Sequence, residues 1–193
     1  MAPRAYRSTK RAEAVQETRR RITEAVVQLH REQGVIATTY DDIARRADVA
    51  PATVYRHFPT MDDLIPACGA RIVEITSPPG PEIFDGKRTP AARLRVLVDE
   101  LFGFWGRAES WLSVGRCEAA KVPALAADLR NWDWAMRALV GATLGEDSSD
   151  HAVRLVKAMT DFYTWKALAA EGLRDEAPAI VTRMLLNHLG IND

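Results

Sequence analysis

The sequence contains few of the features that mark secreted, membrane or disulfide-stabilised proteins. Its only cysteines, Cys68 and Cys117, lie far apart without C-x-x-C spacing, so neither a disulfide framework nor a cysteine zinc site is expected. No stretch approaches the roughly 18 uninterrupted apolar residues that a membrane span needs. The basic segment 1–11 precedes no apolar block or small-residue cleavage site, so no secretory signal is predicted. These absences predict a cytoplasmic protein with reduced thiols.

Sequence signatures of common enzymes are also missing. The chain has no G-x-S-x-G, no phosphate loop, no G-x-G-x-x-G and no H-E-x-x-H. The four histidines, which have no metal-ligand spacing, are His30, His57, His151 and His188. We therefore expect no enzymatic activity, no cofactor and no bound metal.

Charge is balanced over the whole chain but not along it. The 193 residues are 47% apolar and carry 26 Lys and Arg against 26 Asp and Glu, which argues against disorder. Residues 1–60 hold 11 basic against 7 acidic residues, or +4, and residues 61–193 hold 15 against 19, or −4. A basic amino-terminal part on a neutral protein indicates a polyanionic partner, and the alternative is a solvated, frayed tail. Composition alone does not decide between them.

Almost every segment has the periodicity of an amphipathic helix, and no stretch shows the alternation of a strand. The fold class predicted is all-α, with about nine helices in two groups. The helices are expected at about 18–33, 39–47, 51–58, 60–76, 90–105, 108–121, 123–144, 151–170 and 176–189. The Pro- and Gly-rich segment 77–90 is the clearest internal break.

The second and third predicted helices have the spacing of a helix-turn-helix, because they are short and joined by a turn of three residues, Asp48–Ala50. Their apolar positions are Ile43, Ala44, Ala47, Val49, Val54 and Phe58. With these inward, the third helix exposes a short polar and aromatic face. That face consists of Pro51, Ala52, Thr53, Tyr55, Arg56 and His57. For Tyr55 and His57 we prefer surface roles, since Val54 and Phe58 already occupy the inward stripe.

The same segment resembles a known family. Positions 38–64 read T-T-Y-D-D-I-A-R-R-A-D-V-A-P-A-T-V-Y-R-H-F-P-T-M-D-D-L. This run is similar to the DNA-binding domain of the TetR family of bacterial transcription repressors, which commonly shows T-x-x-x-I-A, a turn such as G-V-S, and T-L/V-Y-x-H-F. The similarity extends over Thr18–Leu64. The remaining two-thirds of the chain matches the family only in helical character and length.

The resemblance implies DNA contacts for individual side chains. Those expected at phosphates are Thr39, Tyr55 and His57, and those expected near base edges in the major groove are Pro51, Ala52 and Thr53. Tyr40 and Arg56 hold variable exposed positions, and Arg56 can reach a guanine edge or a phosphate. Arg45 and Arg46 are either backbone contacts or a solvated face, with nothing in the sequence to decide.

Three residues depart from the family pattern. Ala50 replaces a usual Ser N-cap, Asp48 a usual Gly, and Met61 a position often held by a phosphate-binding Lys. These changes weaken the expected binding, and the basic residues between Arg4 and Arg11 can compensate by reaching into an adjacent groove. The domains predicted are a basic flexible arm at 1–17, the helix-turn-helix domain at 18–65 and a helical ligand-binding and dimerisation domain at 66–193.

The last two predicted helices are apolar over more than one narrow stripe, which requires burial on two sides. In the TetR family the corresponding pair forms a four-helix dimer interface, so the resemblance implies a homodimer on a palindromic operator. The alternative is a monomer in which these helices are interior.

Aromatic residues are concentrated in the second part of the chain. As a group they make a pocket for a small apolar or aromatic ligand a reasonable expectation, although for any single ring ordinary core packing is the better interpretation. The ligand-binding candidates are Phe102, Trp105, Trp111, Cys117, Trp132, Met136, Tyr163 and Trp165, with Glu118, Arg116, Asp161 or His151 as polar anchors.

The function predicted is a sequence-specific DNA-binding transcription regulator, a repressor released from its operator by a small ligand. The partners are double-stranded DNA, the ligand and a second copy of the chain, with no membrane. The alternative is a helical ligand-binding or protein-interaction module whose basic helices bind a partner other than DNA. Salt separates the two, because DNA binding weakens steeply with salt concentration.

Overall fold

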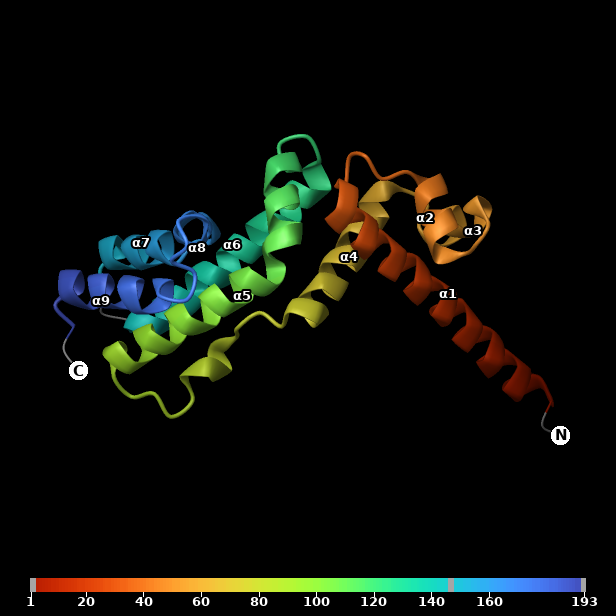
Figure 1. The fold of residues 1–193 in the computed structure, drawn as a ribbon. Coiled ribbons are helices and arrows are strands. Elements are labelled where there is room, and N and C mark those ends of the chain that lie inside the picture. Colours follow the sequence, from red (N-terminus) through yellow and green to blue (C-terminus); the bar gives the residue numbers. More distant parts are fainter. Residues whose placement is uncertain (1–2, 146–147, 192–193) are drawn as a thin grey trace. The chain divides into compact units, whose positions relative to one another are not determined.

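The computed structural model describes residues 3–145 and 148–191, and for residues 3–8 it describes the backbone alone. Every regular element in these ranges is a helix, so the all-α prediction is confirmed (Figure 1). The elements are α1 (Pro3–Gln33), α2 (Tyr40–Ala47), α3 (Pro51–His57), α4 (Met61–Thr76), the 3-10 helix η1 (Pro81–Phe84), α5 (Pro90–Glu118), α6 (Pro123–Leu144), α7 (Asp150–Met159), α8 (Phe162–Ala170) and α9 (Ala177–Leu189).

The chain forms two compact units. The first comprises Met1–Ile75 and Ser110–Leu129, and the second comprises Thr76–Glu109 and Arg130–Asp193. Helices α5 and α6 are therefore divided, because the last part of α5 and the first part of α6 belong to the first unit. The predicted boundary after residue 65 concerns functional domains and stays a prediction.

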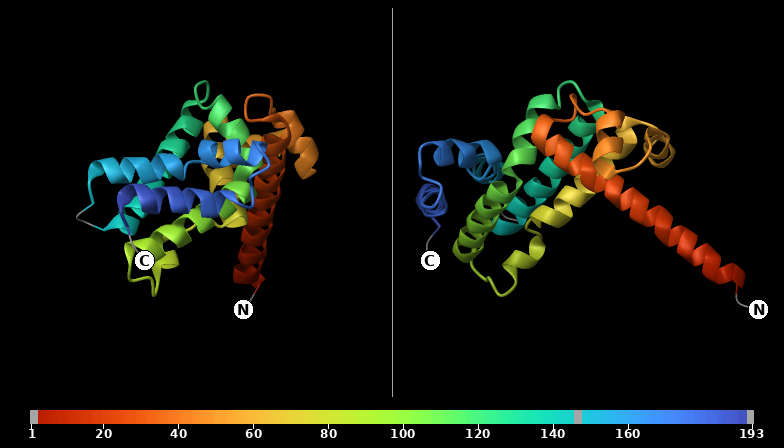
Figure 2. Two further views of the ribbon diagram at one scale, coloured as in Figure 1. Left: turned by 60° about the vertical axis from the view of Figure 1, so that its left-hand side comes forward. Right: turned by 45° about the vertical axis from the view of Figure 1, so that its right-hand side comes forward.

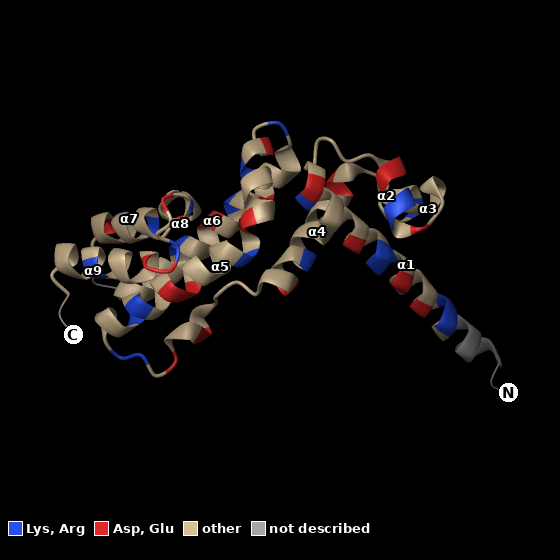
Figure 3. Ribbon diagram, viewed as in Figure 1, with Lys and Arg blue, Asp and Glu red and all other residues tan. Residues whose placement is uncertain are grey.

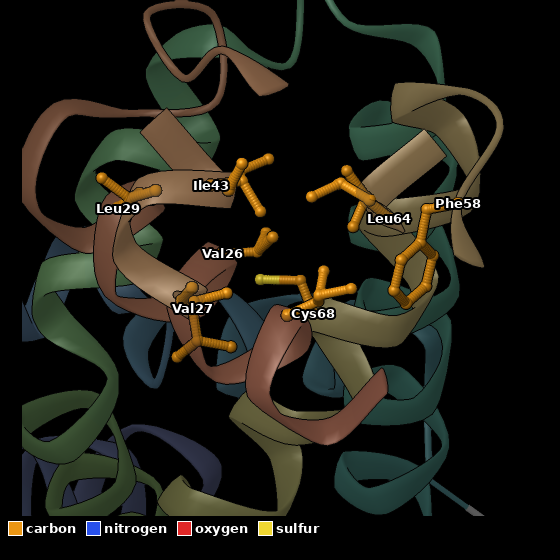
Figure 4. Close-up of a cluster of buried hydrophobic side chains, with 12 residues drawn as sticks. Val26, Val27, Leu29, Ile43, Phe58, Leu64 and Cys68 are labelled. Carbon is orange, nitrogen blue, oxygen red and sulfur yellow. The ribbon is translucent and has the colours of Figure 1, made fainter. Parts of the chain in front are cut away.

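The first unit is built on α1. Ile22, Val26 and Leu29 form one buried stripe along this helix, as their spacing predicts. The buried side chains of α2, α3 and α4 meet that stripe, and Figure 4 shows Ile43, Phe58, Leu64 and Cys68 among them. The recognition segment therefore rests on a continuous apolar cluster. This cluster consists of Ile22, Ala25, Val26, Val27, Leu29, Ile43, Ala44, Ala47, Val54, Phe58, Leu64 and Cys68.

The second unit has its own core around α5. The fully or almost fully buried apolar residues of that helix are Ala91, Leu94, Leu97, Val98, Leu101, Phe102, Phe104, Trp105 and Ala108. Helix α9 lies beside α7 in both views of Figure 2 and contacts α7 and α8. Across the described residues, no helix is both long enough and apolar enough to cross a bilayer.

The first helix begins earlier than its apolar pattern predicts. We expected it to start near Thr18 with a flexible arm before it, whereas α1 begins at Pro3. The segment 5–21 contains no Gly or Pro and is rich in Ala, Arg, Lys, Glu and Gln, which favour helix without burial. The pair Glu17–Arg20, with 2.7 Å between Oε1 and Nη2, adds local support. Apolar periodicity misses such a helix because residues 9–17 are exposed and carry no buried stripe.

Two other boundaries were wrong. The separate helices predicted at 90–105 and 108–121 are one continuous helix, α5. Gly106 lies inside this helix without interrupting it, and a Cβ atom there would be in ordinary contact with the Trp165 ring. Conversely, the single helix predicted at 151–170 is broken after α7, where Asp161 caps α8 by accepting a hydrogen bond from the Tyr163 N–H at 2.9 Å. The buried Trp105 indole N–H donates to the Thr160 carbonyl at 2.9 Å, which stabilises the break.

Candidate DNA-binding surface

Local capping fixes the two helices of the predicted helix-turn-helix. Thr39 begins α2 with a capping box, in which its hydroxyl accepts from the Asp42 N–H and the Asp42 carboxylate accepts from the Thr39 N–H. Asp48 ends α2 in the left-handed conformation, with φ 52°. This is the position at which aspartate replaces the glycine that is usual in the family pattern. Pro51 opens α3 at a position that needs no N–H donor. Each short helix thus has a defined beginning and end.

Buried side chains hold α2 and α3 against each other. Ile43, Val54 and Phe58 are completely buried in the apolar cluster, and the small Ala44 and Ala47 are almost so. Small residues allow two helices to approach closely, and α2 and α3 contact each other as the sequence predicts. This packing leaves the opposite side of α3 free.

The free side of α3 carries the predicted DNA contacts. Pro51, Ala52, Tyr55 and Arg56 are exposed. Thr53 and His57 are partly buried. Burial lowers the pKa of His57, and the neighbouring cations Arg56 and Arg19 lower it further. The His57 imidazole is therefore neutral at pH 7 and can donate or accept a hydrogen bond without adding charge.

Tyr40 has a supporting position beneath this surface. Its ring stacks on the Tyr55 ring, with centroids 4.1 Å apart and planes 1° from parallel. Its hydroxyl donates to the Phe58 carbonyl at 3.0 Å, at the end of α3. Burial raises the pKa of Tyr40, and nearby Tyr55 and Asp63 raise it further. Tyr40 therefore orients Tyr55 and α3, a role that sequence alone did not show.

Two arginines of α1 stabilise the ends of the short helices. The Arg19 guanidinium lies over the Phe58 ring, 4.1 Å from its centroid, and donates to the His57 carbonyl at 3.0 Å. Arg21 donates to the Ala47 carbonyl and, at 2.8 Å, to that of Asp48. Cations at helix carboxyl ends interact favourably with the helix dipole. From the sequence these arginines could be identified only as part of the basic charge, because their partners are 26 to 38 positions away.

Arg45 and Arg46 are both paired within the protein. Arg46 bonds Glu32 through two parallel hydrogen bonds of 2.6 and 3.0 Å and also contacts Gln28. This hydrogen bonding lowers the pKa of Glu32. Arg45 lies 3.2 Å from Asp42. A phosphate contact by Arg46 would therefore have to replace an existing ion pair, although both arginines are exposed on a surface where basic residues occur along α1 and near α2 and α3 (Figure 3).

The predicted ligand residues lie in different places. In the second unit, Phe102, Trp105, Met136 and Trp165 are buried and Trp132 is partly buried. The rings of Trp105, Trp132 and Trp165 form one aromatic cluster with Phe104 and Phe162, through centroid distances of 4.9 to 5.9 Å. Trp111 and Cys117 belong to the first unit, and Tyr163 is 55% exposed. The structure therefore places six of the eight candidates in the second unit, with Tyr163 at its surface, and the other two in the first unit.

An open groove of about 340 Å³ in the second unit reaches this aromatic cluster. Phe102 and Trp165 supply apolar lining, and Asp99, Arg174 and Asp175 supply charged lining. The Arg174 guanidinium lies 4.9 Å from the Trp165 ring centroid and pairs with Glu109 at 3.1 Å. The anchors proposed from sequence lie elsewhere, since Asp161 caps α8 and Glu118 binds the loop after α1.

A smaller cavity of about 70 Å³ lies inside the first unit, lined by His30, Cys68, Asp128 and mostly apolar neighbours. The His30 Nδ1 is 3.4 Å from the Cys68 Sγ, and its Nε2 has no hydrogen-bond partner in the described part of the chain. Burial lowers the pKa of His30 to about 4 and raises that of Cys68 to about 12. Both groups are therefore neutral at pH 7.

The arrangement defines a helix-turn-helix protein with a helical second unit. Residues 22–68 match the family described as "Bacterial regulatory proteins, tetR family". This match spans the helix-turn-helix domain, whose residues resemble the same family in the sequence. Members of this family are transcription regulators and not enzymes, in agreement with the sequence prediction.

Several solved structures share the fold over most of the chain. Salmonella enterica GusR is 23% identical, with a TM-score of 0.57, and the match covers 88% of this chain and 94% of GusR. The multidrug binding protein EbrR, solved with imidazole, is also 23% identical, with a TM-score of 0.60 and coverage of 86% and 88%. A transcriptional regulator from Rhodococcus sp. RHA1 is 21% identical, with a TM-score of 0.66 and coverage of 88% and 96%. No curated protein matches the chain.

Proposed function

We propose that the protein is a dimeric transcription repressor that binds a palindromic operator through α3 and leaves it when a small apolar or aromatic ligand binds. The observation that carries this proposal is the α3 surface. Tyr55 and Arg56 are exposed on it and Thr53 and His57 are partly exposed, while Val54 and Phe58 fix the helix to a buried core. A rigidly held helix with an exposed polar face suits insertion into the major groove. Such a regulator would act in the cytoplasm, where the chromosome lies.

The DNA contacts follow from exposure and from the partners that each side chain already has. We assign base-edge contacts to Pro51, Ala52 and Thr53, and phosphate contacts to Thr39, Tyr55 and His57. Arg56 is the strongest candidate for a charged contact, because it is exposed at the carboxyl end of α3. Tyr40 and Arg46 take secondary roles, since both are bonded within the protein.

Dimerisation is proposed through α7, α8 and α9, the segments predicted as the last two helices. Tyr163 on α8 and Met184 on α9 are large apolar side chains with exposed fractions of 55% and 52%. A second copy would cover them, and a two-fold dimer would place two copies of α3 on half-sites about one helical turn apart. A symmetric operator follows from that geometry.

The groove beside Phe102 and Trp165 is the site that we propose for the ligand. Its aromatic lining suits a flat apolar molecule, and Arg174 adds a cation that can meet a polar group on it. The solved relative EbrR is described as a multidrug binding protein, which supports a ligand-responsive role. A bound ligand would favour a conformation in which the two α3 helices no longer match the operator, with α4 and the continuous helix α5 carrying the change.

The test begins with selection of binding sequences from a pool of random 30-base-pair duplexes. The full-length protein should enrich a palindromic sequence and bind it with steep salt dependence and two protomers per duplex. Arg56→Ala should weaken this binding by about 10-fold or more, on the order expected for a lost base or phosphate contact. Arg88→Ala, which removes the same charge from an exposed position between η1 and α5, outside both α3 and the proposed dimer interface, is the matched control.

Two results would contradict the proposal. Selection without enrichment would remove the sequence-specific function, and binding that is insensitive to salt would favour a module with an apolar partner. Equal losses in Arg56→Ala and Arg88→Ala would show that net charge, and not the α3 surface, governs binding. With an enriched duplex in hand, a small-molecule library can be screened for release of the protein from DNA.

A further inference from the structure

The loop that leads into the helix-turn-helix is held by a side chain from α5. The Val35 N–H and the Ile36 N–H both donate to the same carboxylate oxygen, Oε2 of Glu118, at 2.7 and 3.3 Å. Glu118 is the last residue of α5 and lies 83 positions from Val35 in the sequence. Hydrogen bonds from backbone N–H groups to a carboxylate are stronger than bonds between neutral groups.

Gly34 makes this approach geometrically possible. It is buried and has φ +90°, a left-handed conformation that glycine adopts without strain. A Cβ atom at this position would overlap the Glu118 carboxylate and would also crowd Val114. The glycine after α1 therefore has two functions, to turn the chain and to leave room for the carboxylate.

A second side chain of α5 is bonded to α1 in the same unit. The Trp111 indole N–H donates to the Val27 carbonyl at 3.1 Å, and the Arg31 guanidinium lies 5.7 Å from the Trp111 ring centroid. The hydrogen bond of Trp111 joins α5 to α1, and those of Glu118 join α5 to the loop that follows α1. Trp111 thus fixes where the end of α5 lies, and this position brings the Glu118 carboxylate within reach of the loop.

The loop held by Glu118 fixes the start of α2. The Thr38 hydroxyl donates to the Gly34 carbonyl at 2.6 Å, and the Thr38 N–H donates to the Val35 carbonyl at 3.2 Å. The next residue, Thr39, is the N-cap of α2 and a proposed phosphate contact. A carboxylate on α5 therefore determines the conformation of the segment that places Thr39.

We propose that Glu118 is a positioning residue for DNA binding. This inference rests on the proposed function, because it concerns the affinity of the helix-turn-helix for DNA. Glu118 acts through the backbone of Val35 and Ile36, and its carboxylate does not contact DNA. Without it, residues 34–38 sample more conformations and must be ordered when DNA binds, which weakens binding.

The test compares Glu118→Ala, Glu118→Gln and the wild-type protein on the duplex that the wild type enriches. Glu118→Ala should bind about 10-fold more weakly, because both backbone bonds are lost. Glu118→Gln should recover most of this loss, since an amide oxygen can accept from the same two N–H groups. Glu100→Ala, at an exposed position on the same helix, should bind like the wild type.

A role of Glu118 through its charge and a role through its hydrogen bonds predict opposite effects of the two Glu118 substitutions. If Glu118 mattered only as a negative charge near DNA, both of its variants would bind all DNA more tightly and to the same extent. Equal affinity of Glu118→Ala and the wild type would likewise overturn the inference. Amide hydrogen exchange gives a readout that needs no DNA, since Val35 and Ile36 should exchange faster in Glu118→Ala. Unchanged exchange of these two amides in Glu118→Ala refutes the positioning role. If they exchange faster but the wild-type protein selects no DNA sequence, the proposed function is refuted and the role of Glu118 in holding the loop is not.

Discussion

His30 provides a quantitative prediction about stability and pH. Its imidazole is 6% exposed between α1 and α4, and burial lowers its pKa from 6.5 to about 4. In the folded protein His30 therefore stays neutral between these pH values, while in the unfolded chain it takes up a proton. The unfolded state binds more protons in this range, so the free energy of unfolding decreases as the pH falls.

The size of the effect follows from the difference between the two pKa values. One pKa unit corresponds to 1.36 kcal/mol, so His30 should lower the free energy of unfolding by about 3 kcal/mol between pH 7 and pH 4. Most of this loss should occur below pH 6.5, and it should level off below the folded-state pKa of about 4.

Urea unfolding at pH 7, 6, 5 and 4, followed by circular dichroism, measures this effect in the wild type and in His30→Gln. The glutamine does not titrate, so the stability of the wild type relative to the variant should fall by about 3 kcal/mol over the range. His151→Gln, at an exposed position, is the control and should follow the wild type. A difference between wild type and His30→Gln that does not change with pH would refute the reasoning.

Three further predictions concern the first unit. In the folded protein DTNB should modify the exposed Cys117 quickly and spare Cys68, whose buried thiol has its pKa raised to about 12; two fast-reacting thiols would contradict this. Ile43→Ala should lower the free energy of unfolding by about 2–5 kcal/mol in urea titrations, against less than about 0.5 kcal/mol for exposed Asp41→Ala, and similar losses would argue against the described core. Thr39→Ala should cost about 1 kcal/mol through loss of the capping box, and unchanged stability in the same titration would show that the cap contributes nothing.

Part of the candidate site could be predicted from the sequence because it depends on short-range patterns. The apolar spacing around Ile43 and Val54, the Thr39 cap and the proline at the start of α3 lie within a few residues of one another. Such patterns define which face of a short helix is buried. They therefore predicted both the helix-turn-helix and the exposed face of α3.

Other features could not be predicted because they depend on contacts between distant positions. From the sequence, Tyr40 is predicted to be an exposed variable residue. In the structure its ring stacks on Tyr55 and its hydroxyl donates to the Phe58 carbonyl. From the sequence, Trp111 and Glu118 are interpreted as members of a ligand pocket, yet both lie in the first unit and are bonded to Val27 and Val35.

The sequence by itself determined the fold class, the helix-turn-helix and its resemblance to the TetR family, because helix period, caps and turn residues are local properties of the chain. Only the tertiary structure decided how the helices divide between two units and which polar groups find partners. Helix α5 is one helix that serves both units, although its apolar pattern is the same as that of two shorter helices. A hydrogen bond such as that from Val35 to Glu118 depends on the position of the whole helix, and no local pattern encodes that position.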